Sequence, residues 1–104
     1  MIKVLIIDDE EYAREIINEF LEKHENIYIA GNFSDGFSAL KAIYELRPDL
    51  IFLDIQMPKL TGFEMLELIE DPPLIVFTTA FDEFAIKAFE QNAIDYLLKP
   101  VTPE

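Results

Sequence analysis

The segment IKVLIIDD, residues 2–9, is an apolar run that ends in two acids. Such a run of β-branched and leucine side chains is typical of a strand that is covered on both faces. It is too short for a signal peptide or a membrane-spanning helix. Four similar runs follow along the chain. We therefore predict five buried strands, at residues 2–7, 27–32, 50–53, 74–77 and 94–98.

The segments between these runs have the 3.6-residue periodicity of amphipathic helices. In the first two segments the apolar positions are Tyr12, Ala13, Ile16, Ile17, Phe20 and Leu21, and then Phe37, Leu40, Ile43 and Tyr44. Ser34 is the predicted N-cap of the second helix. A third helix is predicted over residues 62–70, with Phe63, Leu66 and Ile69 facing inward. Asp82 is the predicted N-cap of a fourth helix, which carries Phe84, Ala85, Ala88 and Phe89.

Strands that alternate with helices predict a parallel α/β sheet, because a crossover between parallel strands needs a connection of helical length. The 104 residues suffice for one domain. In such sheets ligands bind beyond the carboxyl ends of the strands. Three carboxylates, two hydroxyls and one ammonium are expected at that edge: Asp8, Asp9, Asp54, Thr78, Thr79 and Lys99.

This set of side chains favours phosphoryl chemistry. Carboxylates a few ångströms apart repel each other, so a cation is expected among them, and Mg²⁺ prefers such oxygen ligands. Lys99 adds a positive charge of the kind that phosphoryl transfer requires. Asp54 could then act as the nucleophile, and Thr79 could donate a hydrogen bond to a phosphoryl oxygen.

Each of these residues also has a simpler interpretation. Asp8 and Asp9 could cap the first helix, and Asp54 could be a turn residue. Thr79 could cap the fourth helix, and Lys99 could be an ordinary solvated charge. Four separate strand ends that all present phosphate-site chemistry favour the functional interpretation.

Composition and motifs exclude several classes. The 8 basic and 21 acidic residues give a net charge of −13, which opposes binding to nucleic acid. The chain has no Cys, which is consistent with the cytoplasm. It also contains neither a Gly-x-Gly-x-x-Gly segment nor a P-loop, so dinucleotide and nucleotide binding lack their phosphate-binding loops.

Four segments, each at the end of a predicted strand, resemble the receiver domain of two-component response regulators: VLIIDDE at 4–10, LDIQMP at 53–58, TA at 79–80 and YLLKP at 96–100. The resemblance covers the whole chain and implies a flavodoxin-like, doubly wound sheet of five strands in the order 2-1-3-4-5. Residues 81–90 and 93–100 are most similar to receivers joined to LytTR-type DNA-binding domains. A haloacid dehalogenase-type phosphatase, by contrast, has a second Asp where this chain has Gln56.

The resemblance implies a magnesium site. Asp9 and Asp54 would bind Mg²⁺ through their carboxylates, and Gln56 through its backbone carbonyl. Asp8 would act mainly through a bound water.

The resemblance also implies that Asp54 is the phosphoacceptor. Thr79 and Lys99 would contact the phosphoryl oxygens, and Tyr96 would move between exposed and buried positions. Phe81 lies two residues beyond Thr79 and offers no polar group to orient a water, which predicts slow loss of the phosphoryl group. The chain would catalyse its own phosphorylation and dephosphorylation without being a conventional enzyme, and a sensor histidine kinase would be its partner.

Receivers normally carry a fifth helix after the Lys99-Pro100 step, whereas this chain ends at Glu104. We therefore expect residues 1–104 to form a receiver truncated before its last helix, without an output domain. A homodimer is expected to cover the apolar face left open. DNA would be bound only through the absent output domain, and no association with a membrane is expected. The alternative is a pseudo-receiver, a protein-binding module that works without phosphorylation.

Overall fold

The computed structural model describes residues 1–80 and 93–99, with only the backbone of Tyr96 and Leu98. These residues form five strands and three helices, so the predicted α/β architecture with a parallel sheet is confirmed. The elements are β1 (Ile2–Ile7), α1 (Glu11–Glu22), β2 (Ile27–Phe33), α2 (Gly36–Leu46), β3 (Leu50–Asp54), α3 (Gly62–Glu67), β4 (Leu74–Thr79) and β5 (Asp95–Leu98).

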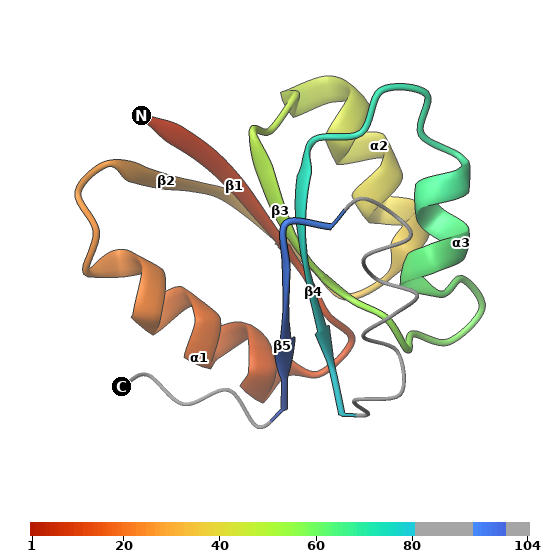
Figure 1. The fold of residues 1–104 in the computed structure, drawn as a ribbon, viewed down its shortest axis with the longest axis horizontal. Coiled ribbons are helices and arrows are strands. Elements are labelled where there is room, and N and C mark those ends of the chain that lie inside the picture. The colour runs from red at the N-terminus through yellow and green to blue at the C-terminus, as the bar shows by residue number, and fades with distance from the viewer. Residues whose placement is uncertain (81–92, 100–104) are drawn as a thin grey trace.

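The strands pair in the order β2-β1-β3-β4-β5, and every neighbouring pair is parallel. Their carboxyl ends therefore lie along one edge of the sheet, which is the lower edge in Figure 1. The order changes direction at β1 and β3, and the connections from these strands leave on opposite faces. Such a point is where open α/β sheets bind their ligands.

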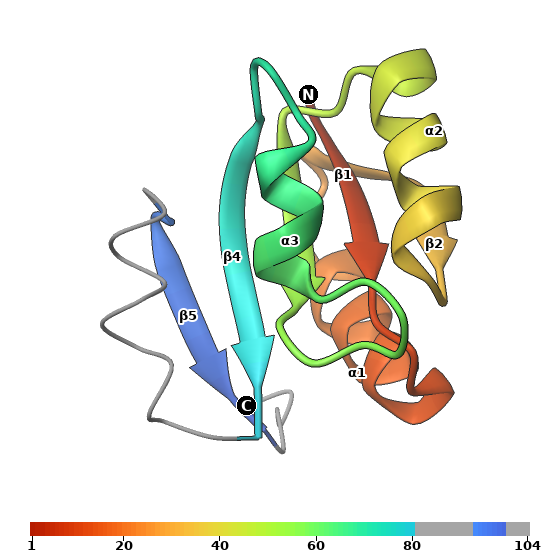
Figure 2. The ribbon, with the colours of Figure 1, turned by 90° about the vertical axis from the view of Figure 1, so that its right-hand side faces the viewer.

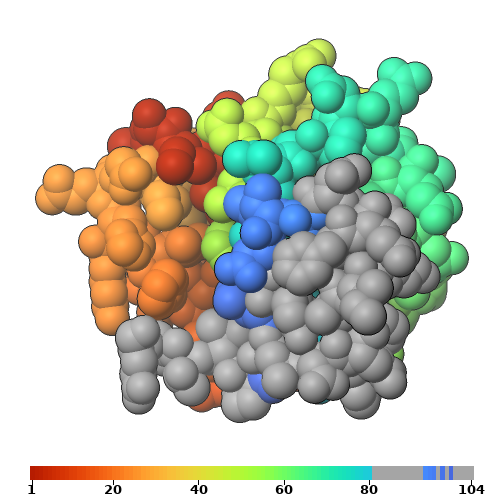
Figure 3. All heavy atoms as spheres, viewed as in Figure 1, coloured from red at the N-terminus to blue at the C-terminus, as the bar shows by residue number. Residues whose placement is uncertain are grey.

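Helices cover both faces of the sheet (Figure 2). On one face α1 packs against β1, with Val4, Ile6, Ile17 and Leu21 as its buried cluster. On the other face α2 and α3 share a larger cluster with alternate residues of β1, β3 and β4. This double cover explains why residues 4–7 are apolar without alternation. In the space-filling view α1 and α3 lie on opposite flanks, with β5 between them (Figure 3).

The N-cap of α2 is Asp35, so the prediction of Ser34 was wrong. Asp35 has an extended backbone, and its Oδ1 accepts a hydrogen bond from the backbone N–H of Ser38 at 2.8 Å. That hydrogen bond lowers the pKa of the Asp35 carboxyl, as expected for an ionised cap. Ser34 lies one residue too early, because a cap must reach the amide two or three residues ahead.

The helix α3 ends at Glu67, three residues before the predicted end. Thr61 and Glu64 form a reciprocal capping box at its start. Ile69 is still buried, because the chain continues in tight turns beyond the helix. The inward positions of Phe63, Leu66 and Ile69 are confirmed.

Several aromatic side chains of the amphipathic segments point outward, contrary to prediction. Phe37 and Tyr44 of α2 are 59% and 56% exposed, and Tyr12 of α1 is 72% exposed. In α2 the buried positions include Ala39 and Ala42. These small side chains let the helix backbone approach the sheet, which leaves the larger rings at the rim.

Two sequence predictions lie outside the described residues. They are the helix capped by Asp82, with Phe81 before it, and the segment that begins at Pro100. Within the described ranges, none of the helices has the length and apolar character needed to span a membrane.

Candidate functional site

The structure brings together side chains from four strand ends at the carboxyl edge of the sheet. Lys99, directly after β5, places its Nζ 3.0 Å from Asp8 Oδ2 and 3.5 Å from Asp54 Oδ2. Asp8 follows β1, and Asp54 is the last residue of β3. Thr79 ends β4 and accepts a hydrogen bond through its backbone carbonyl from the Lys99 N–H at 2.6 Å. The predicted convergence of these four residues is therefore observed.

Lys99 is the centre of the charge network. Only 13% of its side chain is exposed, and its ammonium is paired with Asp8, Asp54 and Glu10, the last at 2.6 Å from Nζ to Oε1. Burial opposes the ammonium charge, but the hydrogen bond to Glu10 and the charges of Asp54 and Asp8 outweigh burial and raise the Lys99 pKa. The interpretation of Lys99 as an ordinary solvated charge is wrong.

The three consecutive acids after β1 form a cluster in which Asp8, Asp9 and Glu10 each offer an oxygen within 4.8 Å of the others. Asp8 is fully buried, whereas Asp9 and Glu10 are exposed. The Oδ1 atom of Asp8 accepts a hydrogen bond from the Glu10 N–H at 2.9 Å. The N-cap of α1 is Glu10, without a side-chain cap bond, so the interpretation of Asp8 and Asp9 as caps is wrong.

Asp54 is a buried residue, with 2% of its surface exposed. Burial raises its pKa to about 8, the charge of Asp8 and the side chain of Asp9 add to this effect, and Lys99 opposes it. The N–H of Gln56 donates a hydrogen bond to Asp54 Oδ1 at 3.3 Å. Without a further cation, the carboxylates of this site are not all stable in the ionised form near neutral pH.

The acidic site fits a hard divalent cation. Asp8 Oδ2 is buried, and the Lys99 ammonium, 3.0 Å away, is its ion-pair partner. The carboxylate oxygens of Asp8, Asp9 and Glu10 outnumber this ammonium, and several carboxylate oxygens on one edge are the ligand chemistry that Mg²⁺ takes in proteins. The residues present are therefore suited to that ion.

The main chain of Asp54 is held by the start of α3. The N–H of Gly62 donates to the carbonyl of Ile55 at 2.8 Å, and a Cβ at position 62 would come within 2.5 Å of the Asp54 carbonyl oxygen. Only glycine allows this approach of two backbones. Gly62 thus positions the backbone at the end of β3, from which the Asp54 side chain extends.

The remaining predicted residues have different surroundings. Thr78 and Thr79 are both buried, and the Thr78 hydroxyl has no hydrogen-bond partner in the part of the chain that the structure describes. Gln56 is exposed. Tyr96 pairs with Phe77 in the sheet register, and its side chain lies outside the described part.

Two further residues contact the site and were not predicted from the sequence. Glu10 makes the shortest ion pair of Lys99, and Arg14 donates from Nη1 to the backbone carbonyl of Asp8 at 2.5 Å. A third acid directly after Asp8 and Asp9 was a signal for Glu10. Arg14 lies in α1, about one helical turn beyond Glu10, and no local sequence pattern predicts its contact with Asp8.

A hollow of about 560 Å³ lies elsewhere, at the opposite edge of the sheet. It lies between the end of α2 and the start of β4, with Tyr44, Arg47, Asp71 and Leu74 among its lining residues. No residue of the carboxyl-edge site lines it. The convergent charges, and not this hollow, identify the candidate site.

The family model described as the response regulator receiver domain matches residues 4–104. The chain is 54% identical, over 103 residues, to the transcriptional regulatory protein BtsR of Escherichia coli strain K12, a match that covers 97% of this chain and 43% of BtsR. It is 50% identical to an uncharacterized response regulatory protein of Vibrio parahaemolyticus, again over 43% of that protein. The chain thus spans less than half the length of these relatives.

Solved structures support the same family. The response regulatory domain of protein mrkE from Klebsiella pneumoniae aligns with a TM-score of 0.87 and 38% identity, over 97% of this chain and 85% of that chain. The response regulator domain of CheB from Thermotoga maritima aligns with a TM-score of 0.87 and 29% identity, over 100% and 82% of the two chains. The flavodoxin-like α/β fold with a parallel sheet is therefore confirmed.

Proposed function

We propose, because this chain belongs to the response regulator receiver domain family, that it is a phosphoacceptor switch whose reacting group is Asp54. The observation that carries the proposal is the buried Asp54 carboxylate, with the Lys99 ammonium 3.5 Å away at the carboxyl edge of the sheet. A carboxylate held beside an ammonium is suited to accept a phosphoryl group.

In the proposed step an oxygen of the Asp54 carboxylate forms a bond to phosphorus. The bond from phosphorus to the donor breaks, and the donor keeps the electron pair. With a histidine kinase this donor atom is an imidazole nitrogen, and with acetyl phosphate it is an acetate oxygen. Lys99 would neutralise charge on the phosphoryl oxygens, and the Thr79 hydroxyl would donate a hydrogen bond to one of them.

The metal in this proposal is Mg²⁺, held by the carboxylates of Asp9 and Asp54 and the backbone carbonyl of Gln56, with Asp8 acting through a water. When bound, the ion would supply positive charge opposite the carboxylates and the phosphoryl oxygens. The cluster of Asp8, Asp9 and Glu10, whose carboxylate oxygens lie within 4.8 Å of one another, supports this site.

Calorimetric titration with Mg²⁺ tests the ligand set. Asp9→Ala should abolish Mg²⁺ binding, because it removes a ligand. Lys99→Ala should leave Mg²⁺ binding intact or strengthen it, because the ammonium repels the ion. If both variants bind Mg²⁺ as the parent chain does, the proposed ligand set is wrong.

Intact-mass measurement after incubation with acetyl phosphate tests the phosphoacceptor. With Mg²⁺ the parent chain should gain one phosphoryl group, and addition of a chelator should prevent the gain. Asp54→Ala should gain none. Asp71→Ala, which removes an exposed acid at the opposite edge of the sheet, should behave like the parent. A parent chain that takes up no phosphoryl group from several donors would favour the pseudo-receiver alternative.

The proposed physiological partners follow from the family. We propose that a sensor histidine kinase supplies the phosphoryl group and that the longer protein controls transcription through a LytTR-type DNA-binding domain. The similarity to BtsR, a transcriptional regulatory protein, supports this output. Purified kinase and chain in a phosphotransfer assay test the first part. Sequencing of the gene beyond residue 104 tests the second.

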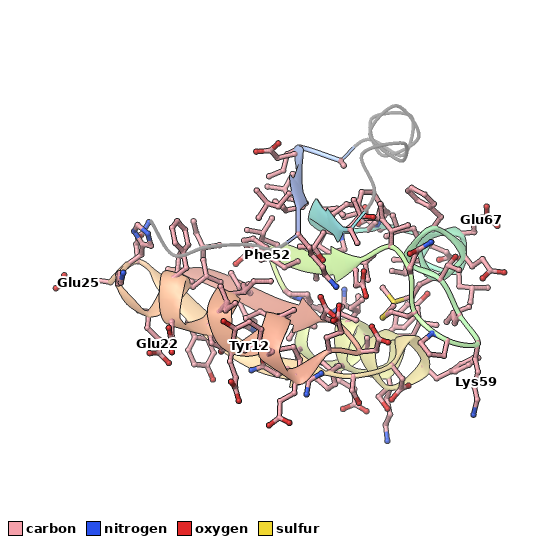
Figure 4. All side chains as sticks on the ribbon, turned by 90° about the horizontal axis from the view of Figure 1, so that it is seen from below. Tyr12, Glu22, Glu25, Phe52, Lys59 and Glu67 are labelled. Atoms are coloured by element: carbon pink, nitrogen blue, oxygen red, sulfur yellow. The ribbon has the colours of Figure 1, made fainter. Side chains whose placement is uncertain are left out.

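We also propose that two copies of the chain associate through the outward side of α1. Tyr12 and Phe20 are 72% and 38% exposed there, and Figure 4 shows Tyr12 on the outside of that helix. Exposed apolar side chains of this size are common at interfaces. Light scattering should give a dimer for the parent and a monomer for the double variant Tyr12→Lys, Phe20→Lys. A monomeric parent would contradict the proposal.

A further inference from the structure

Glu10 belongs to the site but is neither a proposed metal ligand nor a proposed contact of the phosphoryl group. Its Oε1 lies 2.6 Å from Lys99 Nζ, closer than the oxygens of Asp8 at 3.0 Å and Asp54 at 3.5 Å. Glu10 is also the most exposed partner, since 63% of its side chain is accessible against 1% and 3% for the two aspartates. The shortest ion pair of Lys99 therefore lies at the outer rim of the site.

The side chain of Glu10 is free for this contact because it does not cap its helix. Glu10 is the N-cap residue of α1, with an extended backbone at φ −95° and ψ 116°, and it makes no side-chain cap hydrogen bond. Asp, Asn, Ser or Thr is the usual choice at this position. The longer Glu carboxylate instead reaches across to β5, while its own N–H is fixed by Asp8 Oδ1 at 2.9 Å.

The Lys99 ammonium lies closer to Glu10 than to Asp54, the proposed phosphoacceptor. Lys99 has one positive charge, and the carboxylate that binds it most closely is not that of the phosphoacceptor. A phosphoryl group on Asp54 would bring additional negative charge to the inner side of the ammonium. The outer and inner anions then compete for the same cation, and the balance depends on the charge at Asp54.

We propose that Glu10 is a positioning residue that holds Lys99 at the rim of the site in the unphosphorylated chain and loses it to the phosphoryl group. The proposal rests on the proposed function of Asp54. Lys99 is the group through which Glu10 acts, and Glu10 itself does not touch the reacting atoms. Its exposed carboxylate is readily solvated once the ion pair opens, so release of Lys99 leaves no buried charge behind.

The test compares rates of phosphorylation by acetyl phosphate, followed by intact mass at saturating Mg²⁺. Glu10→Gln should be phosphorylated about fivefold faster than the parent chain, because Lys99 no longer has to leave an ion pair of this kind. Glu11→Gln is the matched control. It removes the same charge one residue further on, at the exposed first residue of α1, and should change the rate less than twofold.

A double-variant cycle separates action through Lys99 from a general effect of charge. In the Lys99→Ala background, Glu10→Gln should no longer change the rate, and intact mass can follow even slow transfer over hours. If Lys99→Ala takes up no phosphoryl group, the phosphorylation rate of Glu10→Asp is the test of action through Lys99. The shorter side chain of this variant keeps the charge but loses the 2.6 Å contact, so the variant should be phosphorylated faster than the parent.

The outcomes distinguish the two proposals. A parent chain that accepts no phosphoryl group on Asp54 overturns both. A parent that is phosphorylated, with Glu10→Gln no faster than Glu11→Gln, overturns the role of Glu10 alone. An equal acceleration by Glu10→Gln with and without Lys99 also overturns it, because the effect would then be one of net charge.

Discussion

Replacement of Asp54 by Asn tests whether the folded chain is destabilised by its own site. Burial and the neighbouring acids raise the Asp54 pKa from 3.8 to about 8, so the folded chain keeps a proton on Asp54 that the unfolded chain has lost. Between about pH 4 and pH 8 the folded state thus binds more protons, and the free energy of unfolding falls as the pH rises through this window. Asn carries no charge at any pH, so the free energy of unfolding of Asp54→Asn should not fall in this way.

The size of the effect follows from the pKa. A rise from 3.8 to about 8 corresponds to at most about 6 kcal/mol, at about 1.4 kcal/mol for each tenfold change in proton affinity. Side chains rearrange and water enters when the site ionises, which lowers the effective cost. We expect Asp54→Asn to stabilise the chain by about 2–4 kcal/mol at pH 8.5 without divalent cations and to change its stability little near pH 4.

Urea denaturation, followed by circular dichroism with a chelator present, measures this difference across the pH range. Glu67→Gln is the control, since Glu67 is exposed on α3, far from α1 in Figure 4, and should change stability by less than about 0.5 kcal/mol. Millimolar Mg²⁺ should stabilise the parent more than Asp54→Asn, because the ion offsets the repulsion. Equal stability of the parent and Asp54→Asn at pH 8.5, with equal pH dependence, would refute the electrostatic argument.

Three further substitutions have expected outcomes. Gly62→Ala should destabilise the chain by about 2–4 kcal/mol in urea denaturation and slow phosphorylation of Asp54, because its Cβ would displace the Asp54 carbonyl; a parent-like melting curve would contradict this. Thr78→Val should stabilise by about 1 kcal/mol, because it removes a buried hydroxyl that has no hydrogen-bond partner in the described part of the chain, and any clear loss of stability would count against it. Thr61→Ala should cost about 1 kcal/mol through loss of the α3 capping box, with no change in Mg²⁺ affinity by calorimetry.

The strands were predictable from the sequence because both faces of the sheet are covered. Burial on two sides requires apolar residues without alternation, as in residues 4–7, and that pattern is visible without a structure. The site was predictable for the same reason, since Asp8 and Asp54 are the first polar side chains after such runs. Once the strands are located, the positions of these two residues at the carboxyl edge of the sheet follow.

Helix orientation was less predictable, because the sequence does not tell which apolar residues of a helix touch the sheet. Phe37 and Tyr44 have the spacing of a buried face, yet Ala39 and Ala42 occupy it. Close packing favours the small residues at the nearest approach, and this preference arises only when helix and sheet meet. The ion pair between Glu10 and Lys99 was not predictable for a related reason, since it joins residues 89 positions apart.

The two sides of the site differ in how far they can respond to a change at Asp54. On the α3 side, Gly62 and the Asp54 carbonyl pack so closely that a Cβ at position 62 would lie 2.5 Å from the carbonyl oxygen. On the opposite side, the Lys99 ammonium pairs with the buried Asp8 and Asp54 and, at the solvated rim, with Glu10. The Lys99 N–H also donates a hydrogen bond to the backbone carbonyl at the end of β4. Ion pairs at a solvated rim exchange at little cost, whereas packed backbones do not. We therefore expect the charge placed on Asp54 to be transmitted through Lys99 toward Glu10 and the end of β4, while β3 and α3 serve as the fixed support.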